Sequence, residues 1–352
     1  TIRKNRITAA STQIDVKTAK AAMFPSLSFS TGQQVVNRPY QETSSRVSGS
    51  EIISSNSKTS YNGNYGLNAS WTLYNGNKRL KTIQQEKLNN QMAELDVATS
   101  ENNIQESIAQ VYIQILYAAE SVKVNENTLQ VSIAQRDRGQ ELLNAGSIAK
   151  SDLAQLEAQV STDRYQLVTA QATLEDYKLQ LKQLLELDGE NEMNIYLPTL
   201  SDENVLAPLP TKRDVYISAL SLRPEIEASK LNVEASELGI NIAKSSYFPT
   251  ISLSAGIGTN HTSGSDFTFG EQVKNGWNNS IGLSVSVPIF NNRQTKSAVQ
   301  KAKLQYETSM LSLLDEQKAL YKTIESLWLD ANSAQQRYAA ANEKLKSTQI
   351  SY

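Results

Sequence analysis

The stretch Phe24-Pro25-Ser26-Leu27-Ser28-Phe29-Ser30 decides how the rest of the sequence is interpreted, because it recurs as Phe248-Pro249-Thr250-Ile251-Ser252-Leu253-Ser254. A second matching pair follows, Trp71-Thr72-Leu73-Tyr74-Asn75-Gly76-Asn77 and Val287-Pro288-Ile289-Phe290-Asn291-Asn292-Arg293. Each copy reads as helix, strand, polar loop, strand and long helix. Self-similarity of this kind predicts an internally duplicated fold.

The expected strands of both copies alternate between apolar residues and small polar residues. The apolar positions are Tyr65, Leu67, Ala69, Trp71 and Leu73 in the first copy, and Ile251, Leu253, Ala255, Ile257, Ile281, Leu283, Val285, Val287 and Ile289 in the second. This alternation is typical of a membrane barrel with an apolar outer surface. It is also typical of a half-buried soluble sheet, so alternation alone leaves both interpretations open. Polar loops are expected at 41–60 and 261–279.

The helical segments carry a sustained heptad pattern, with apolar positions spaced alternately by three and four residues. In the second long helix these positions are Leu153, Leu156, Val160, Asp163, Leu167, Ala170, Leu174, Tyr177, Leu181 and Leu184. Asp163 is the one charged residue in that run. A 3.5-residue period predicts left-handed supercoiling against a partner helix. Apolar residues on a second face of the last helix predict packing on two sides, as in a closed ring of helices.

The first long helix is expected from about Lys78 to Leu143, which corresponds to about 100 Å at ~1.5 Å per residue. An ordinary globular domain is not that wide. A shorter helix returns from Ser151, and a further short helix near Asp214–Leu222 ends at a break at Arg223-Pro224. Seven segments are predicted. They are a first helix at 1–23, a hairpin of strands at 24–75, a helical hairpin at 76–189, an irregular segment at 190–213, helices at 214–247, a second hairpin of strands at 248–291 and a long helix at 292–352.

Composition excludes several classes of function. Net charge is −2 and basic residues are spread along the chain, which disfavours nucleic acid as a partner. The 352 residues contain no cysteine and one histidine, so a disulfide framework, a thiolate nucleophile, a zinc cluster and a serine triad are disfavoured. No apolar run reaches the roughly 18 residues of a transmembrane helix. We therefore expect no enzyme activity, cofactor or metal, and any membrane span must be made of strands.

Four strands per chain cannot close a barrel, because the smallest membrane barrels have about eight strands. An open four-stranded sheet in lipid would leave two unpaired edges, and each unsatisfied backbone group would cost several kcal/mol. If the strands lie in a membrane, several chains must share one barrel, and the attached amphipathic helices would continue as a helical cylinder.

With these features the whole chain resembles the TolC-like outer-membrane efflux family. The resemblance rests on the duplicated motif at Phe24 and Phe248, on the two strand ends quoted above, and on the turn Leu143-Asn144-Ala145-Gly146-Ser147-Ile148-Ala149-Lys150-Ser151-Asp152-Leu153. It implies a mixed α and β fold with long antiparallel coiled-coil helices. In a homotrimer, the helices would form a periplasmic α-barrel, and four strands per chain would form a 12-stranded transmembrane β-barrel in outer-membrane lipid.

The resemblance also implies a function, namely passive export of small molecules or proteins in a tripartite efflux or type I secretion system. The partners would be a periplasmic adaptor and an inner-membrane pump, and the location would be the bacterial outer membrane. Adaptor docking would fall on the tip residues Asn144, Ala145, Gly146, Ser147, Ile148 and Ala149. Many relatives carry an apolar residue where this chain has Ser147. The second copy is expected to stop at Tyr352, before its own tip.

Other residues have a functional and a plain interpretation. Ser147 or Ser151 is expected to cap the returning helix. Tyr65, Trp71, Tyr74 and Trp277 are expected to form an aromatic girdle at the membrane surface, the alternative being ordinary strand packing. For His261, with Asp266 and Glu271 as nearby acids, we expect a solvated loop residue rather than a metal ligand. Trp328 is expected to pack between helices.

Two other functions remain open at this point. The chain could be a soluble coiled-coil scaffold or adaptor with a small ordinary sheet, or a helical pore-forming toxin. The cleanly apolar strand faces favour the export channel over a scaffold. A toxin would be secreted as a soluble monomer, so detergent-free behaviour would separate it from the channel.

Overall fold

A computed structural model of the chain describes residues 2–40, 44–48, 51–55, 58–187, 195–196, 205–265 and 267–351. The chain forms two compact units. The sheet unit contains Arg3–Asp96 and Lys212–Glu325, and the hairpin unit contains Val97–Thr211 and Ser326–Tyr352 together with Thr1–Ile2. Two long helices, α2 (Lys78–Asn144) and α7 (Gln294–Ser351), contribute residues to both units.

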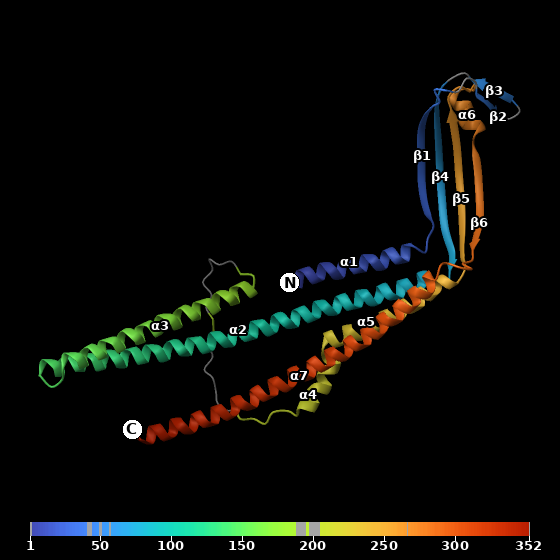
Figure 1. The fold of residues 1–352 in the computed structure, drawn as a ribbon. Coiled ribbons are helices and arrows are strands. Elements are labelled where there is room, and N and C mark those ends of the chain that lie inside the picture. The colour runs from blue at the N-terminus through green and yellow to red at the C-terminus, as the bar shows by residue number, and fades with distance from the viewer. Residues whose placement is uncertain are drawn as a thin grey trace. The chain divides into compact units, whose positions relative to one another are not determined.

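An antiparallel sheet of four strands dominates the sheet unit (Figure 1). Its strands are β1 (Ser26–Asn37), β4 (Thr59–Asn75), β5 (Thr250–Thr262) and β6 (Asn278–Ser286), and they lie in the order β1-β4-β5-β6. The central pair β4–β5 joins two hairpins that lie far apart in the sequence. The mixed α and β fold class with four antiparallel strands is thus confirmed.

The two loops predicted to be polar connectors contain secondary structure, so that part of the prediction is wrong. The first holds a two-stranded hairpin of β2 (Ser44–Ser48) and β3 (Glu51–Ser55). The second holds a short helix, α6 (Phe269–Asn275). A capping box explains α6, because the hydroxyl of Thr268 accepts from the backbone N–H of Glu271 while the carboxylate of Glu271 accepts from the backbone N–H of Thr268.

The sheet unit also contains further, shorter helices. They are α1 (Ile2–Ala21), α4 (Lys212–Leu222) and α5 (Pro224–Lys244), which continues into the 3₁₀ turn η2 (Ser245–Tyr247). Thr12 of α1 donates to the side-chain oxygen of Asn90 over 3.1 Å, and Gln85 donates to the backbone oxygen of Ala235 over 2.9 Å. These contacts place α1 and α5 beside α2. The predicted break is confirmed, with Pro224 at the first position of α5.

A small apolar core holds α4 against α5 and α7 in the sheet unit. Ile226 is fully buried and lies with Leu320 and Ile324 of α7. Apolar residues of α4 pack against this group, and Tyr216 meets Tyr321 edge to face at 5.4 Å between ring centroids. Burial of such side chains contributes roughly 1.5–3 kcal/mol each.

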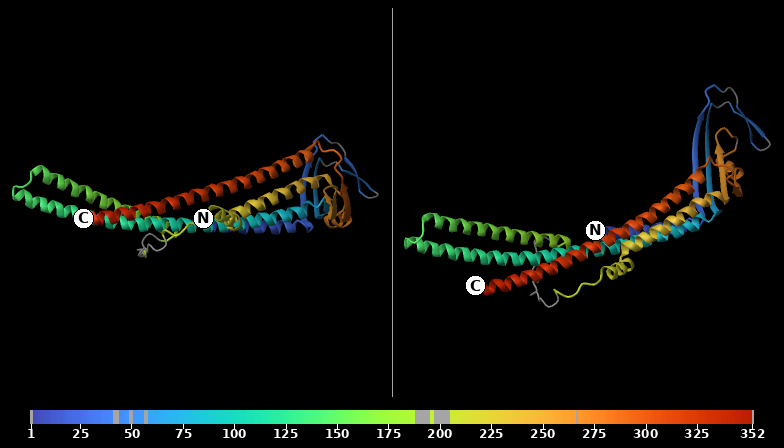
Figure 2. Two further views of the ribbon diagram at one scale, coloured as in Figure 1. Left: turned by 90° about the horizontal axis from the view of Figure 1, so that it is seen from below. Right: turned by 60° about the horizontal axis from the view of Figure 1, so that its bottom comes forward.

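The hairpin unit is built from α2 and α3 (Lys150–Leu184), which lie antiparallel and side by side in both views of Figure 2. The predicted irregular segment at 190–213 lies partly outside the described residues, at 190–194 and 197–204. Its described part bonds to α7 of the same unit, where Gln335 donates to the backbone oxygens of Val205 and Ala207. Within the described part of the chain, no helix is both long and apolar enough to cross a membrane.

Candidate functional site

The register of the four-stranded sheet sorts its side chains into two faces. Paired residues align as rows across the strands, and one face carries the rows Leu27–Ala69–Ala255–Ile281, Phe29–Leu67–Ile257–Asn279, Trp71–Leu253–Leu283 and Tyr74–Ile251–Val285. The other face carries Ser26–Ser70–Ser254–Gly282, Ser28–Asn68–Gly256–Ser280 and Ser30–Gly66–Gly258–Asn278. The predicted division into an apolar face and a small polar face is therefore confirmed for these rows.

Strand ends depart from the predicted alternation in two places. The β4–β5 register shifts between Thr72 and Tyr74, so Leu73 is a bulged residue and Tyr74 takes its place opposite Ile251. The last strand, β6, ends at Ser286, so Val287 and Ile289 lie beyond the ladder. Pro288 explains this end, because it lacks a backbone N–H to donate.

The apolar face of the sheet is exposed. Leu27 is 69%, Phe29 67% and Ile281 80% exposed. Even on the two central strands, Leu67, Trp71 and Ile257 are each about 40% exposed. A half-buried soluble sheet covers its apolar face with its own helices or a second sheet. No described element of this chain covers these rows, so the face requires an apolar environment from outside the chain.

The polar face is lined by hydroxyl and amide groups. Along the described residues of β1, β4, β5 and β6 there is no Asp, Glu, Lys or Arg. Several hydroxyls donate to backbone oxygens of the neighbouring strand, for example Ser254 to Gly282 over 3.3 Å and Ser284 to Ser252 over 3.4 Å. This face suits contact with water.

Predicted girdle residues lie at two levels of the sheet. Trp71 and Tyr74 lie near the helical end, and the indole N–H of Trp71 donates to the backbone oxygen of Met23 over 2.7 Å. Gly66, Gly258 and Asn278 form one row across the strands. Tyr65 and Trp277 are the next residues toward the loops on their own segments, so they lie at about the same height, nearer the loop end of the sheet. The sequence placed Tyr65, Trp71 and Tyr74 on a strand and Trp277 in a polar loop, and the register separates the four aromatics into two groups.

His261 differs from the prediction, because it belongs to β5 rather than to a solvated loop. It pairs with Gly63, and its ring stacks with Tyr65 at 5.9 Å and meets Phe269 edge to face at 5.1 Å. Its Nδ1 atom is buried without a hydrogen-bond partner in the described structure. The absence of a side chain at position 63 is what allows the imidazole to lie over the strand.

The acids near His261 do not form a metal site in the described part of the chain. Thr268 holds the Glu271 carboxylate, and the backbone and side-chain hydrogen bonds from Thr268 lower the pKa of Glu271. Asp266 lies outside the described residues. Over the described residues, no group of three His, Cys, Asp or Glu side chains is suitably placed to hold a metal ion.

Arg79 joins the sheet to the helices. Its guanidinium donates to the backbone oxygen of Ala22 over 2.8 Å and to that of Thr72. The hydroxyl of Ser245 donates to the backbone oxygen of Gly76 over 2.9 Å, so η2 packs on the turn between β4 and α2. This junction was not predicted from the sequence, because its acceptors are backbone atoms of distant segments.

The candidate docking tip joins α2 to α3 through a Schellman motif. Gly146 has φ +73°, the backbone N–H of Ser147 donates to Leu142, and that of Gly146 donates to Leu143. Apart from Ile148, which is half-buried, the six predicted tip residues are exposed. The predicted serine cap is wrong. Ala149 is the N-cap residue, and the Asp152 carboxylate accepts from its backbone N–H over 3.1 Å.

Behind the tip, the two helices of the hairpin come close together. A Cβ at Gly139 would lie 2.4 Å from Leu156 Cδ1 and 3.8 Å from Ile148 Cδ1. Leu156 therefore occupies the space that a side chain at position 139 would fill, and Ile148 folds back onto the same place. This packing leaves the polar residues of the tip as its outer surface.

Both helices of the hairpin unit also carry apolar residues that face away from their mutual seam. They are Ile113, Tyr117, Val124 and Val131 on α2, and Tyr165, Val168 and Leu179 on α3, and all are more than half exposed. Their spacing follows the heptad period, which predicts further helix partners on these faces.

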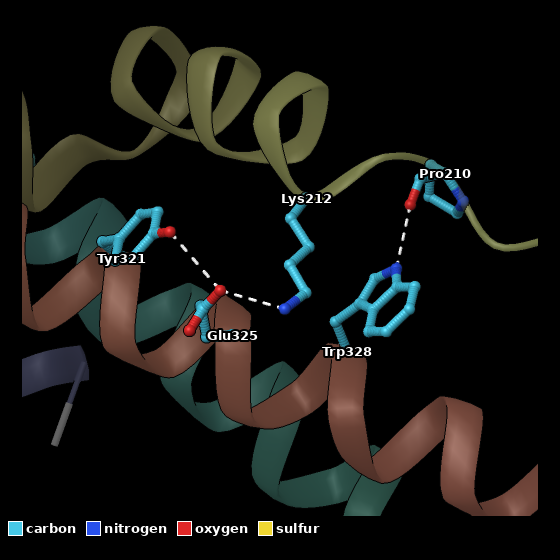
Figure 3. Close-up of polar contacts among 5 residues, drawn as sticks. All are labelled: Pro210, Lys212, Tyr321, Glu325 and Trp328. Atoms are coloured by element: carbon cyan, nitrogen blue, oxygen red, sulfur yellow. Dashed lines mark hydrogen bonds and ion pairs between the residues drawn. The ribbon is translucent and has the colours of Figure 1, made fainter.

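Polar contacts hold the start of α4 and the residues just before it (Figure 3). Within the sheet unit, Lys212 pairs with Glu325 over 2.9 Å, and the hydroxyl of Tyr321 donates to the same carboxylate. The hydrogen bond and charge of Lys212 lower the pKa of Glu325. Within the hairpin unit, Trp328 does not simply pack between helices. Its indole N–H donates to the backbone oxygen of Pro210 over 3.1 Å.

Comparison with known proteins identifies relatives of this chain. The family model for outer membrane efflux proteins matches residues 1–186 and 215–352. The chain is 25% identical to the outer membrane efflux protein BepC of Brucella suis over 71% of its own length and 52% of BepC, and 24% identical to the outer membrane protein TolC of Escherichia coli K12 over 69% of its own length and 50% of TolC. The chain spans about half the length of the curated relatives it matches.

A crystal structure of CusC shares the fold, with a TM-score of 0.76 and 20% identity over 99% of this chain and 78% of CusC. At that identity the likeness concerns the fold alone. The family match covers the four strands of the large sheet and both long helices, α2 and α7. The chain therefore belongs to the outer membrane efflux protein family and resides in the bacterial outer membrane, with its helices in the periplasm.

Proposed function

We propose that three copies of this chain form one passive export duct across the outer membrane. Each copy would contribute β1, β4, β5 and β6 to a 12-stranded barrel. The observation that carries this proposal is the exposed apolar face on a sheet whose outer strands, β1 and β6, each pair on one side only in the described structure. Sister copies would pair those edges, and lipid would cover the apolar face.

The dimensions of the apolar face support a membrane span. The rows from Ile251 to Ile257 cover six residue steps, about 20 Å at ~3.3 Å per residue. Aromatic residues lie at both ends of this band, with Trp71 and Tyr74 at one level and Tyr65 and Trp277 at the other. Membrane barrels carry an apolar band of about 25 Å between two aromatic girdles. We assign these four residues to the girdles.

We propose that the long helices of both copies of the repeat together form the ring of helices. The turns that follow the two repeated strand ends share a left-handed conformation, at Gly76 and Asn77 in one copy and at Asn292 and Arg293 in the other. This agreement supports an internal duplication. The outward apolar stripes of α2 and α3 would pack against neighbouring helices, giving the periplasmic α-barrel of the trimer.

For the hairpin tip, we propose docking to a periplasmic adaptor that links the duct to an inner-membrane pump. The exposed small or polar residues Asn144, Ala145, Gly146, Ser147 and Ala149 support this role. Among the relatives, one is named a toxin and drug export protein and another a cation efflux system protein. By this proposal the chain works in a tripartite efflux or type I secretion system and leaves its cargo chemically unchanged.

Adjacent residues on β5 provide a matched test. Ala255 lies on the apolar face and Ser254 on the polar face, both in the middle rows of the sheet. In lipid, Ala255→Lys should cost about 2–4 kcal/mol per copy, whereas a lysine facing a water-filled lumen is tolerated. We expect Ala255→Lys to abolish trimers in outer-membrane fractions and Ser254→Lys to retain them.

Three measurements test this. They are outer-membrane fractionation, native mass spectrometry in detergent compared with three times the denatured mass of one subunit, and drug susceptibility of a deletion strain carrying each variant. Equal tolerance of both lysines, or purification of the unmodified protein as a detergent-free monomer, would refute the duct. A detergent-free monomer would instead support a soluble scaffold or a secreted toxin.

A further inference from the structure

Buried polar residues interrupt the seam between α2 and α3. Asp163 is 4% exposed and Ser132 is 5% exposed, although the flanking seam positions of α3 are occupied mainly by apolar residues such as Val160 and Leu167. The side-chain amide of Gln159, one turn away on α3, donates to Asp163 over 2.9 Å. A buried carboxylate is unfavourable in an apolar seam unless hydrogen bonds compensate for its lost hydration.

The packing behind the tip shows that Ser132 and Asp163 share a layer. Gly139 lies directly against Leu156. Ser132 comes seven residues before Gly139, and Asp163 comes seven residues after Leu156. Seven residues are two turns of a supercoiled helix, so on antiparallel helices these two positions return to the same level. The hairpin therefore contains a polar layer, Ser132–Asp163, two turns behind the Gly139–Leu156 contact.

A polar layer specifies register because a shifted alignment changes the partner of its buried charge and disturbs the apolar packing around it. Shifting α3 by one layer would set Asp163 against Leu129 and would remove Leu156 from the space above Gly139. The opposite shift would bring Asp163 to Arg136, whose guanidinium already pairs with Asp137 at 2.5 Å, and would again displace Leu156. Any such slip would also change which residues form the turn at the tip.

We propose that the Ser132–Asp163 layer sets the register of the α2–α3 hairpin and so positions its docking tip, at the expense of stability. Asp163 is a positioning residue, since it lies 14 residues beyond the N-cap Ala149, about four helical turns from the tip, and acts through the alignment of the helices. The functional part of this inference rests on the proposed docking function, whereas the register itself can be measured without it.

Cysteine cross-linking can measure the register, because none of the 352 residues of this sequence is a cysteine that would compete with an introduced pair. Asn125 lies seven residues before Ser132, and Ala170 lies seven residues after Asp163, so these two residues share the next such layer away from the tip. The pair Asn125→Cys with Ala170→Cys therefore reports the native register. Asn125→Cys with Leu167→Cys reports the slip that sets position 163 against Leu129. Disulfide yield is read by mass spectrometry of the oxidised protein in detergent.

We expect Asp163→Leu to raise the melting temperature, because an apolar residue replaces a buried charge. We expect the native-register cross-link to fall roughly two-fold or more and the slipped cross-link to rise. Asp163→Asn should keep the native cross-link, since an amide can make the same polar contacts. Leu181→Ala, at a buried apolar position of the same helix, should lower the melting temperature and leave the ratio of cross-links unchanged.

An unchanged cross-link ratio in Asp163→Leu, or a fall in its melting temperature, would overturn the inference. In export assays with the deletion strain, Asp163→Leu should lose complementation although it reaches the outer membrane, and Asp163→Asn should retain it. If the cross-links shift while the deletion strain shows no export defect, the register inference stands and the proposed function fails.

Discussion

His261 lies over Gly63 on the neighbouring strand, so closely that a Cβ at position 63 would be 2.1 Å from His261 Cε1. Tyr65 and Phe269 flank the imidazole, which limits where it can move. Position 63 must therefore lack a side chain, because the ring of His261 from the other hairpin occupies that space. This relationship ties β4 to β5, and so the first hairpin of the sheet to the second, at the loop end of the sheet.

Gly63→Ala should destabilise the sheet by about 1–3 kcal/mol, because the added methyl group must displace a confined ring. Thermal unfolding in detergent measures the loss. Gly258→Ala is the matched control, since its Cβ would meet neighbours at 3.6 Å, an ordinary contact. Adding His261→Ala to Gly63→Ala should restore part of the stability. Equal losses in Gly63→Ala and Gly258→Ala would show that the imidazole is not the cause.

Arg79→Ala should loosen the junction between sheet and helices. Its guanidinium bonds two backbone oxygens, Ala22 and Thr72, and each acceptor left unsatisfied costs about 1–3 kcal/mol where water does not replace the donor. Arg79→Lys should recover only part of this, because an ammonium group lacks the planar fork. Faster proteolysis near Met23 would report the loosening. Lys78→Ala, which removes an exposed cation beside it, should leave the cleavage rate unchanged.

The ion pair between Lys212 and Glu325 predicts a pH dependence of stability. Its hydrogen bond and charge lower the pKa of Glu325 from 4.5 in the folded protein, so folding favours the ionised carboxylate. The contribution is fully present above pH 4.5 and is lost as the pH falls through the lowered value. The melting temperature should therefore exceed that of Glu325→Gln near neutral pH, and the difference should disappear in acid. Glu316→Gln, an exposed change on the same helix, should show no such convergence.

At the tip, Gly146→Ala should destabilise the turn by about 1–2 kcal/mol, because φ +73° is unfavourable for a residue with a Cβ. Steric overlap is not the reason, since nothing lies within 4 Å of that Cβ position. Gly270→Ala is the control, because the space there is equally open and its φ is not positive. Hydrogen exchange of the amides around Ser147 would accelerate only in Gly146→Ala. Unchanged exchange would indicate that the turn accommodates the methyl group.

Much of the local structure could be predicted from the residues themselves. The Leu-Ser alternation of the strands assigned the two faces correctly, and the heptads of α3 identified the residues of its seam, including Asp163. Gly146 marked the helix end. The serine cap failed because a carboxylate three residues into a helix can reach back to the first backbone N–H even when the N-cap residue is Ala149.

Pairings between distant segments could not be predicted. Alternation assigns a face but not a neighbour, so the order β1-β4-β5-β6, the bulge at Leu73 and the place of His261 over Gly63 emerged only in the folded chain. The contacts of Arg79 could not be predicted either, because its acceptors are backbone oxygens, which every residue carries.

The sequence by itself determined the periodicities of this protein, and with them which side chains share a face of each strand or helix, because backbone geometry repeats every two or 3.6 residues. Only the tertiary structure decided which faces stay uncovered. Burial depends on what the rest of the chain brings to a surface, and here no described element covers the apolar side of the sheet.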